Sequence, residues 1–141
     1  MTEQPAPAET YPTTPELLAA ISTATVQAMK QQYGKGPVSA KSYLVDDLLF
    51  VVLRGGITRA ERTMVDAGRQ QSVRRFRQEF ENEMTKPLVA IVERLTGRRV
   101  ISYQSQVLFD PDMSVKIFVF DDRLDADASA PSAAAPLRVV D

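Results

Sequence analysis

Apolar residues recur at helical spacing in two stretches of this 141-residue chain. The first stretch follows Thr14-Pro15-Glu16, in which a threonine cap, a proline at the first helical position and an acid near the positive end of the dipole are typical of a helix start. Gly34 ends this stretch, because glycine adopts the left-handed conformation of a helix C-terminus without steric penalty. We therefore expect a first helix from residue 14 to residue 34.

The second helical stretch begins at the capping box of Thr58 and Glu61 and ends at Gly97. Gly68 is expected to interrupt it, and Pro87 is expected to kink it because proline lacks the backbone N–H of a helix interior. Its apolar stripe has steps of three and four and consists of Val73, Phe76, Phe80, Met84, Leu88, Ile91 and Leu95.

Arg77 is out of place on this stripe. At 100° per residue it lies inside the arc defined by Val73, Phe80 and Met84. Its guanidinium must snorkel to solvent, pair with a buried acid or face another subunit, and snorkelling is the favoured outcome. A subunit interface comes next, because so long a stripe has more apolar surface than a four-stranded sheet covers.

Two extended patterns predict hairpins over residues 38–53 and 100–120. The run from Leu48 to Leu53 is apolar on both faces, as in a central strand. In the last strand the side chains alternate, with Val115, Ile117 and Val119 on one face and Lys116, Phe118 and Phe120 on the other. The order helix, hairpin, helix, hairpin predicts an α+β fold, a two-layer sandwich in which two helices cover one face of a four-stranded antiparallel sheet. An intertwined dimer of the same elements is the alternative architecture.

The chain is expected to form one folded domain, over residues 14–120. The flanking segments, 1–13 and 121–141, are rich in proline, alanine and acidic residues, and they carry too little apolar surface to offset the entropy of ordering, so both are predicted to be disordered tails. Within the domain the two halves share a weak similarity, in which Gly34, Ser39 and Ser42 match Gly97, Ser102 and Ser105 at a constant offset.

The amino-acid composition excludes several kinds of site and mechanism. The chain contains no histidine, cysteine or tryptophan. A disulfide framework, a cysteine-bearing zinc site, a Ser–His–Asp triad, a cysteine nucleophile and a histidine general base are therefore excluded. No apolar run approaches the roughly 20 residues of a membrane-spanning helix, and the start of the chain lacks a signal-peptide pattern. A cytoplasmic location without a cofactor is the resulting expectation.

Two motifs suggest ligand sites but have simpler structural explanations. The loop around Lys35 follows a helix, whereas a phosphate-binding loop opens one, so it is interpreted as a helix end whose lysine attracts an anionic partner at most. Carboxylates at the two expected hairpin turns could together hold a divalent cation, but aspartate is common in turns for local backbone bonding, and no metal is assigned. These turn carboxylates are Asp46, Asp47, Asp110 and Asp112.

Residues 54–77 contain seven arginines against two acids. Pairs four residues apart would satisfy part of this charge within the helix, namely Arg62–Asp66, Arg75–Glu79 and Arg77–Glu81. Aromatic residues for base stacking are missing from the exposed face, which disfavours nucleic acid as a partner. The candidate partner-binding or anion-binding residues are Lys35, Arg69, Arg74, Arg75 and Arg77.

A series of short motifs runs in order through residues 16–120. They are Tyr33-Gly34-Lys35-Gly36-Pro37, Ser42-Tyr43, Asp46-Asp47, Leu53-Arg54-Gly55, Ile57-Thr58-Arg59-Ala60-Glu61, Leu95-Thr96-Gly97-Arg98 and Asp110-Pro111-Asp112. Together they resemble the MpsC-like family, which is named for a Na⁺-translocating membrane potential-generating system. Pro87 departs from the uninterrupted helix expected in that family. The resemblance implies an association with membrane ion or inorganic-carbon transport, and it carries over no catalytic residue.

These observations lead to one hypothesis and two alternatives. The hypothesis is a non-enzymatic, self-associating accessory or regulatory protein in the cytoplasm, a dimer as the first expectation, which binds a larger protein partner at the membrane. The first alternative is a polyanion-binding module that uses the arginine-rich helix. An enzyme based on carboxylates and a metal ranks last, because no convergent acid–base set is visible.

Overall fold

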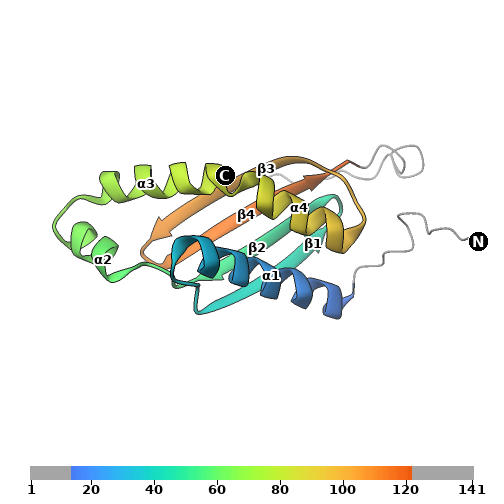
Figure 1. Ribbon diagram of the computed structural model, residues 1–141, viewed down its shortest axis with the longest axis horizontal. Coiled ribbons are helices and arrows are strands. Elements are labelled where there is room, and N and C mark those ends of the chain that lie inside the picture. Colours follow the sequence, from blue (N-terminus) through green and yellow to red (C-terminus); the bar gives the residue numbers. More distant parts are fainter. Residues whose placement is uncertain (1–13, 122–141) are drawn as a thin grey trace, which may run out of the picture.

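Four helices and four strands make up the computed structural model, which describes residues 14–121 (Figure 1). The elements are α1 (Pro15–Tyr33), β1 (Ser39–Val45), β2 (Leu48–Arg54), α2 (Arg59–Asp66), α3 (Gln70–Glu83), α4 (Thr85–Thr96), β3 (Val100–Phe109) and β4 (Asp112–Phe120). The expected order of helix, hairpin, helix, hairpin and the α+β class are confirmed. The expected tails, residues 1–13 and 121–141, lie outside the described residues apart from Asp121.

Helix α1 has the termini that its sequence predicts. The side-chain oxygen of Thr14 accepts a hydrogen bond from the backbone N–H of Leu17 at 3.0 Å, and Pro15 occupies the first turn. At the other end Gly34 has a φ of 89°, and its N–H donates to the carbonyl of Lys30. This left-handed residue is the reason why glycine ends the helix here.

The second helical stretch is three helices, so the expectation of two helices in total is wrong. The capping box of Thr58 and Glu61 opens α2 with both of its reciprocal hydrogen bonds. Gly68, with a φ of 82°, lies in the turn that separates α2 from α3. A second break, at Met84, falls just before Pro87, which has no N–H to donate to the carbonyl one turn earlier.

The sheet has the strand order β1-β2-β4-β3, and all neighbours are antiparallel. The two hairpins therefore lie edge to edge, with β2 and β4 in the middle. Each hairpin follows a helix that ends in a left-handed glycine, Gly34 or Gly97. In each first strand the matching serine, Ser42 or Ser105, is buried. The weak internal similarity of the sequence thus coincides with two spatially equivalent helix-hairpin units.

One face of the sheet carries the helices, as Figure 1 shows. A large hydrophobic cluster lies beneath α1 and α4 and consists of Ile21, Met29, Leu49, Val51, Leu53, Met84, Leu88, Val92, Phe118 and Phe120. A second, smaller cluster consists of Ile57, Val73, Val107 and Phe109. Phe76, which we expected in the core, is 55% exposed at the edge of α3, where its ring lies 6.2 Å from that of Tyr33.

The other face of the sheet is not covered by any described helix. Side chains alternate along each strand, and those that point away from the helices are exposed or half-buried, whereas their neighbours are mostly buried. We call this surface the open face and define it by its apolar residues, Tyr43, Val45, Leu48, Phe50, Val52, Leu108, Met113, Val115, Ile117 and Val119. It includes large side chains with considerable exposure, such as Tyr43 at 45% and Val45 at 54%.

Candidate functional site

A lysine lies at the centre of the covered side of the sheet. Lys116 has the same strand parity as Phe118, so alternation directs its side chain under the helices, where it has no exposed surface. Its ammonium group forms a short ion pair with Glu81 of α3, whose side chain is also buried. A buried ion pair contributes little net stability compared with a well-packed apolar pair, so its presence in a core calls for an explanation.

Two residues of β3 complete this polar centre. Tyr103 donates its phenolic hydrogen to Glu81 at 3.4 Å. Ser105 lies directly across the β-ladder from Lys116. Its Oγ is buried and has no hydrogen-bond partner in residues 14–121. Burial lowers the pKa of Lys116, against the opposing attraction of Glu81. Burial and the negative charge of Glu81 both raise the pKa of Tyr103 well above its ordinary value.

Arg77 belongs to a second buried ion pair, next to the first along α3. Its Nε and Nη2 donate to the two carboxylate oxygens of Glu61 at 3.0 and 2.9 Å, and Nη2 also donates to the carbonyl of Gly56 at 2.8 Å. The guanidinium lies 4.9 Å from the centroid of the Tyr33 ring. Of the three outcomes considered for Arg77, pairing with a buried acid is the one observed. The expected Arg77–Glu81 pair is wrong, because each residue finds an oppositely charged partner on another element.

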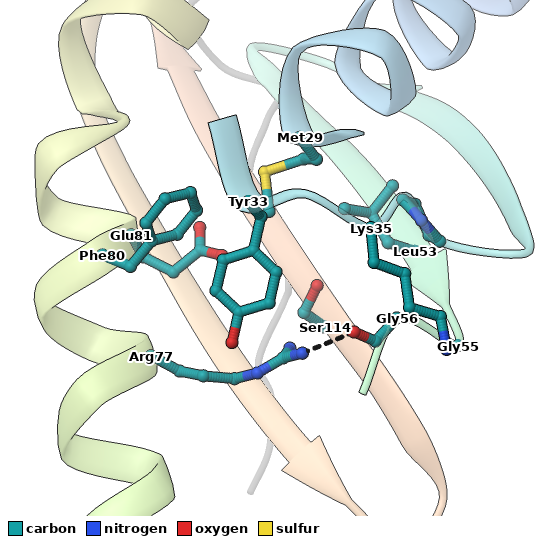
Figure 2. A pocket seen from close by; sticks show the side chains of 11 residues that line it. Met29, Tyr33, Lys35, Leu53, Gly55, Gly56, Arg77, Phe80, Glu81 and Ser114 are labelled. Carbon is teal, nitrogen blue, oxygen red and sulfur yellow. Dashed lines mark hydrogen bonds between the residues drawn. The ribbon is translucent and has the colours of Figure 1, made fainter. Parts of the chain in front are cut away.

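A small pocket opens beside Arg77, between the end of α1, the β2–α2 loop, α3 and β4 (Figure 2). Its volume of about 20 Å³ admits a group the size of a water molecule. Polar groups line it from Lys35, Arg77, Glu81 and Ser114. Its apolar wall includes Met29, Tyr33, Leu53 and Phe80. In Figure 2 the Arg77 side chain passes below the Tyr33 ring to reach Gly56.

The five predicted cationic residues do not form one patch. Lys35 and Arg77 line the same pocket, and Lys35 donates to the carbonyl of Ile57 at 3.0 Å. Arg74 is held against β3, where it donates to the carbonyl of Val107. The remaining two, Arg69 and Arg75, are exposed. Arg74 and Arg77 therefore do not belong to the polyanion-binding surface that the sequence suggested. Arg77 is part of a buried ion pair instead.

The four turn carboxylates lie at opposite ends of the sheet. The β1–β2 turn adjoins the end of β4, since the N–H of Phe120 donates to the carbonyl of Asp47. The β3–β4 turn adjoins the end of β2, where Asp112 accepts from the N–H of Ile57 at 3.3 Å. About seven residues of strand, roughly 23 Å, separate the two turns. They do not share a cation, and residues 14–121 contain no cluster of three or more acidic side chains that could hold a metal ion.

The position of Arg77 could be identified from the sequence, but its surroundings could not. Strand alternation places Lys116 on the same face as Phe118, and this shared parity is the signal that the lysine is buried. Glu61 was assigned to the capping box alone, and in the structure its carboxylate serves both the cap and Arg77. Glu81 lies on α3 one turn after Arg77, a spacing that indicates an intrahelical pair and conceals the contact with β4.

These features define the class of the protein. It is an antiparallel α+β domain with a charged centre under its helices and an uncovered apolar face on its sheet. The sequence profile of the family described as Na⁺-translocating membrane potential-generating system (MpsC) matches residues 13–122. The chain therefore belongs to the MpsC family, which confirms the resemblance of its motifs. Comparisons with curated proteins and with solved structures found no match. Among the helices of residues 14–121, none combines the length and hydropathy that crossing a bilayer requires.

Replacing Tyr103 by phenylalanine should remove a source of alkaline destabilisation. Because the folded protein raises the Tyr103 pKa above 10, the unfolded chain loses this proton first, and stability falls as the pH rises above 10. The loss amounts to about 1.4 kcal/mol per pH unit. In urea unfolding at pH 10 and pH 11, the stability of the wild type should fall relative to that of Tyr103→Phe by this slope, because other groups titrate equally in both proteins. The exposed Tyr43→Phe is the matched control, and parallel slopes in all three proteins would contradict the assignment.

Proposed function

We propose that this protein is a non-enzymatic, self-associating accessory or regulatory protein of a membrane ion-transport system, located in the cytoplasm, and that two copies associate through their open faces. Membership of the MpsC family supports the link to ion transport. The exposed apolar residues of the open face support the proposal of self-association. A second, larger protein at the membrane is the partner that such a dimer would serve.

The open face has the chemistry of an interface. Its central strands present valine, isoleucine and phenylalanine side chains, and the residues Phe50 and Ile117 are direct cross-strand neighbours at its middle. Its charged side chains, Lys41 and Arg54, lie toward one end, opposite Val52 and Ser39 respectively. A contiguous exposed apolar surface of this kind on a small protein marks an interaction site.

A second copy is the occupant that the shape of this face favours. The part of the sheet where all four strands run side by side is about seven residues long, the length of β1 and β2, and it spans about 19 by 23 Å. This flat area of about 440 Å² increases with side-chain relief toward the roughly 800 Å² that each partner contributes to a stable interface. Two sheets pack face to face about 10 Å apart with side chains from both interdigitating, and this is the arrangement that we propose for the open faces of two copies.

The molar mass in solution tests this proposal. Multi-angle light scattering at micromolar concentration should give twice the 15.6 kDa of the chain, falling toward the monomer value on dilution. A mass of one chain at every concentration up to about 100 μM would overturn the proposal, since a dissociation constant above that range is too weak for a functional dimer at ordinary cellular levels.

A further inference from the structure

We propose that the pocket beside Arg77 binds a small oxyanion, with Lys35, Arg77 and Ser114 as its hydrogen-bond donors. This site lies on the covered side of the sheet, whereas self-association uses the opposite face. The inference therefore does not rest on the proposed function. It addresses what the buried charged cluster is for.

Two cations of the pocket keep hydrogen-bond donors that remain for a ligand. A guanidinium has five N–H donors. The bonds from Arg77 to Glu61 and Gly56 use the Nε proton and both protons of Nη2, and Nη1 donates to no group within residues 14–121. Likewise Lys35 has three donors, of which one is used on the carbonyl of Ile57. Both cationic side chains are therefore held in place by hydrogen bonds and keep N–H donors for a ligand.

The side chains that line the pocket carry a net positive charge. Among the residues that line the pocket, Lys35 and Arg77 are cations and Glu81 is the acid. The carboxylate of Glu81 is already paired with Lys116, just as the guanidinium of Arg77 is paired with Glu61. The two buried pairs balance, and Lys35 leaves the site with an excess positive charge that an anion neutralises. Charge-assisted hydrogen bonds to such an anion are about twice as strong as neutral ones.

The size of the pocket and its access to solvent limit the ligand. About 20 Å³ is too small for a nucleotide or an organic metabolite and is enough for one oxygen atom of an oxyanion. Ser114 and Arg77 both line this space, and Figure 2 shows Ser114 next to the end of the Arg77 side chain. Since Lys35 is exposed, it stands where the rest of the ligand meets solvent. A phosphate group, free or at the end of a larger molecule, fits these requirements.

Inorganic phosphate is the probe that tests the site. Calorimetric titration at constant ionic strength, with chloride as the compensating anion, should show saturable binding with a dissociation constant of about 1 mM. Lys35→Gln should weaken this binding at least about tenfold, and Ser114→Ala about threefold, because each removes one hydrogen bond from the ligand. The matched control is Lys86→Gln, which makes the same charge change at an exposed position on α4 and should leave the affinity within about twofold.

Three results would overturn the proposal. They are the absence of saturation by about 20 mM phosphate, equal binding by the Lys35 and Lys86 variants, and equal competition by chloride. A parallel titration with vesicles that contain phosphatidic acid identifies the source of the phosphate group. Binding that depends on Lys35 in both titrations assigns a lipid phosphate, and binding to the free ion alone assigns a soluble one. Dimerisation is measured by the molar mass, and phosphate binding is measured by calorimetry. The failure of one proposal therefore does not prevent a test of the other.

Discussion

Replacing Glu81 by leucine should lower the free energy of unfolding by about 3–5 kcal/mol at pH 7. The change leaves the ammonium group of Lys116 in a fully buried position without a counter-charge. The folded protein avoids this charge by releasing the proton, which costs about 5 kcal/mol at pH 7 for a lysine of ordinary pKa 10.5 and sets the upper limit of the loss. Chemical denaturation monitored by circular dichroism measures the effect.

The pH dependence of Glu81→Leu distinguishes this cause from a general loss of packing. With Lys116 neutral in the folded state and charged in the unfolded state, the unfolded chain binds the extra proton. Stability of the variant should therefore rise with pH, by about 1.4 kcal/mol per unit, between pH 7 and pH 10. Glu83→Leu, at an exposed position two residues after Glu81 at the end of α3, is the control and should change stability by less than about 0.5 kcal/mol.

Removing both charges should restore most of the stability. In the double variant Glu81→Leu with Lys116→Met, two apolar side chains of similar size replace the pair, and such replacements are neutral or stabilising. We expect the double variant to lie within about 1 kcal/mol of the wild type and to have lost the pH dependence of the single variant. A single variant as stable as the wild type would show that the pair is solvated in solution.

Replacing Ile117 by lysine should raise the dissociation constant of the dimer at least 100-fold. Ile117 lies on β4 at the middle of the open face, between Phe50 on one side and Gln104 on the other. In a stacked pair of sheets its side chain is desolvated at the centre of the contact, where truncations and charges have their largest effects. Two lysines related by a two-fold axis would also repel each other there.

A matched substitution separates this effect from a change in net charge. Gln71→Lys adds the same charge on the exposed side of α3, on the helical layer, and should leave the dissociation constant within about threefold. Because Ile117 is only half-buried in one copy, the monomer of Ile117→Lys should still fold, as its far-ultraviolet circular dichroism will report. A variant that remains dimeric at the wild-type concentration would show that the open face is not the interface.

The local parts of this fold could be predicted from the sequence. Each prediction that the structure confirms depends on a few neighbouring residues, such as the cap at Thr14, the glycine at residue 34 and the capping box at Thr58. The two hairpins and their order follow in the same way, because strand alternation and turn residues are local signals. The helix count was missed because the break at Met84 depends on how the chain accommodates Pro87 over the sheet.

The site could be predicted only in part. Periodicity placed Arg77 on an apolar stripe, and no local pattern names its partner, because Glu61 belongs to a different helix and Lys116 reaches α3 from a strand 35 residues beyond Glu81. Charged residues four apart on one helix suggest a pair, and here tertiary contacts override that suggestion. Phe76 was expected in the core because its spacing fits the apolar stripe, but in the structure its side chain is 55% exposed beside Tyr33.

The two faces of the sheet carry different kinds of side chains. The covered face holds two buried ion pairs and a pocket with unused donors. The open face has apolar side chains across its middle, and its charges lie toward one end. An account in which one face binds a ligand and the other binds a second copy gives each set of residues a role. It also explains how a chain without histidine or cysteine functions, because binding and association require neither.

Nuclear Overhauser effects between two differently labelled copies test the central claim most directly. A mixture of ¹³C-methyl-labelled and unlabelled protein should give intermolecular cross-peaks at the methyl groups of Val115, Ile117 and Val119 and none at Leu88 or Val92, which lie under the helices. The account predicts this pattern at concentrations where light scattering reports a dimer. A dimer whose intermolecular cross-peaks arise only from helical residues would contradict it.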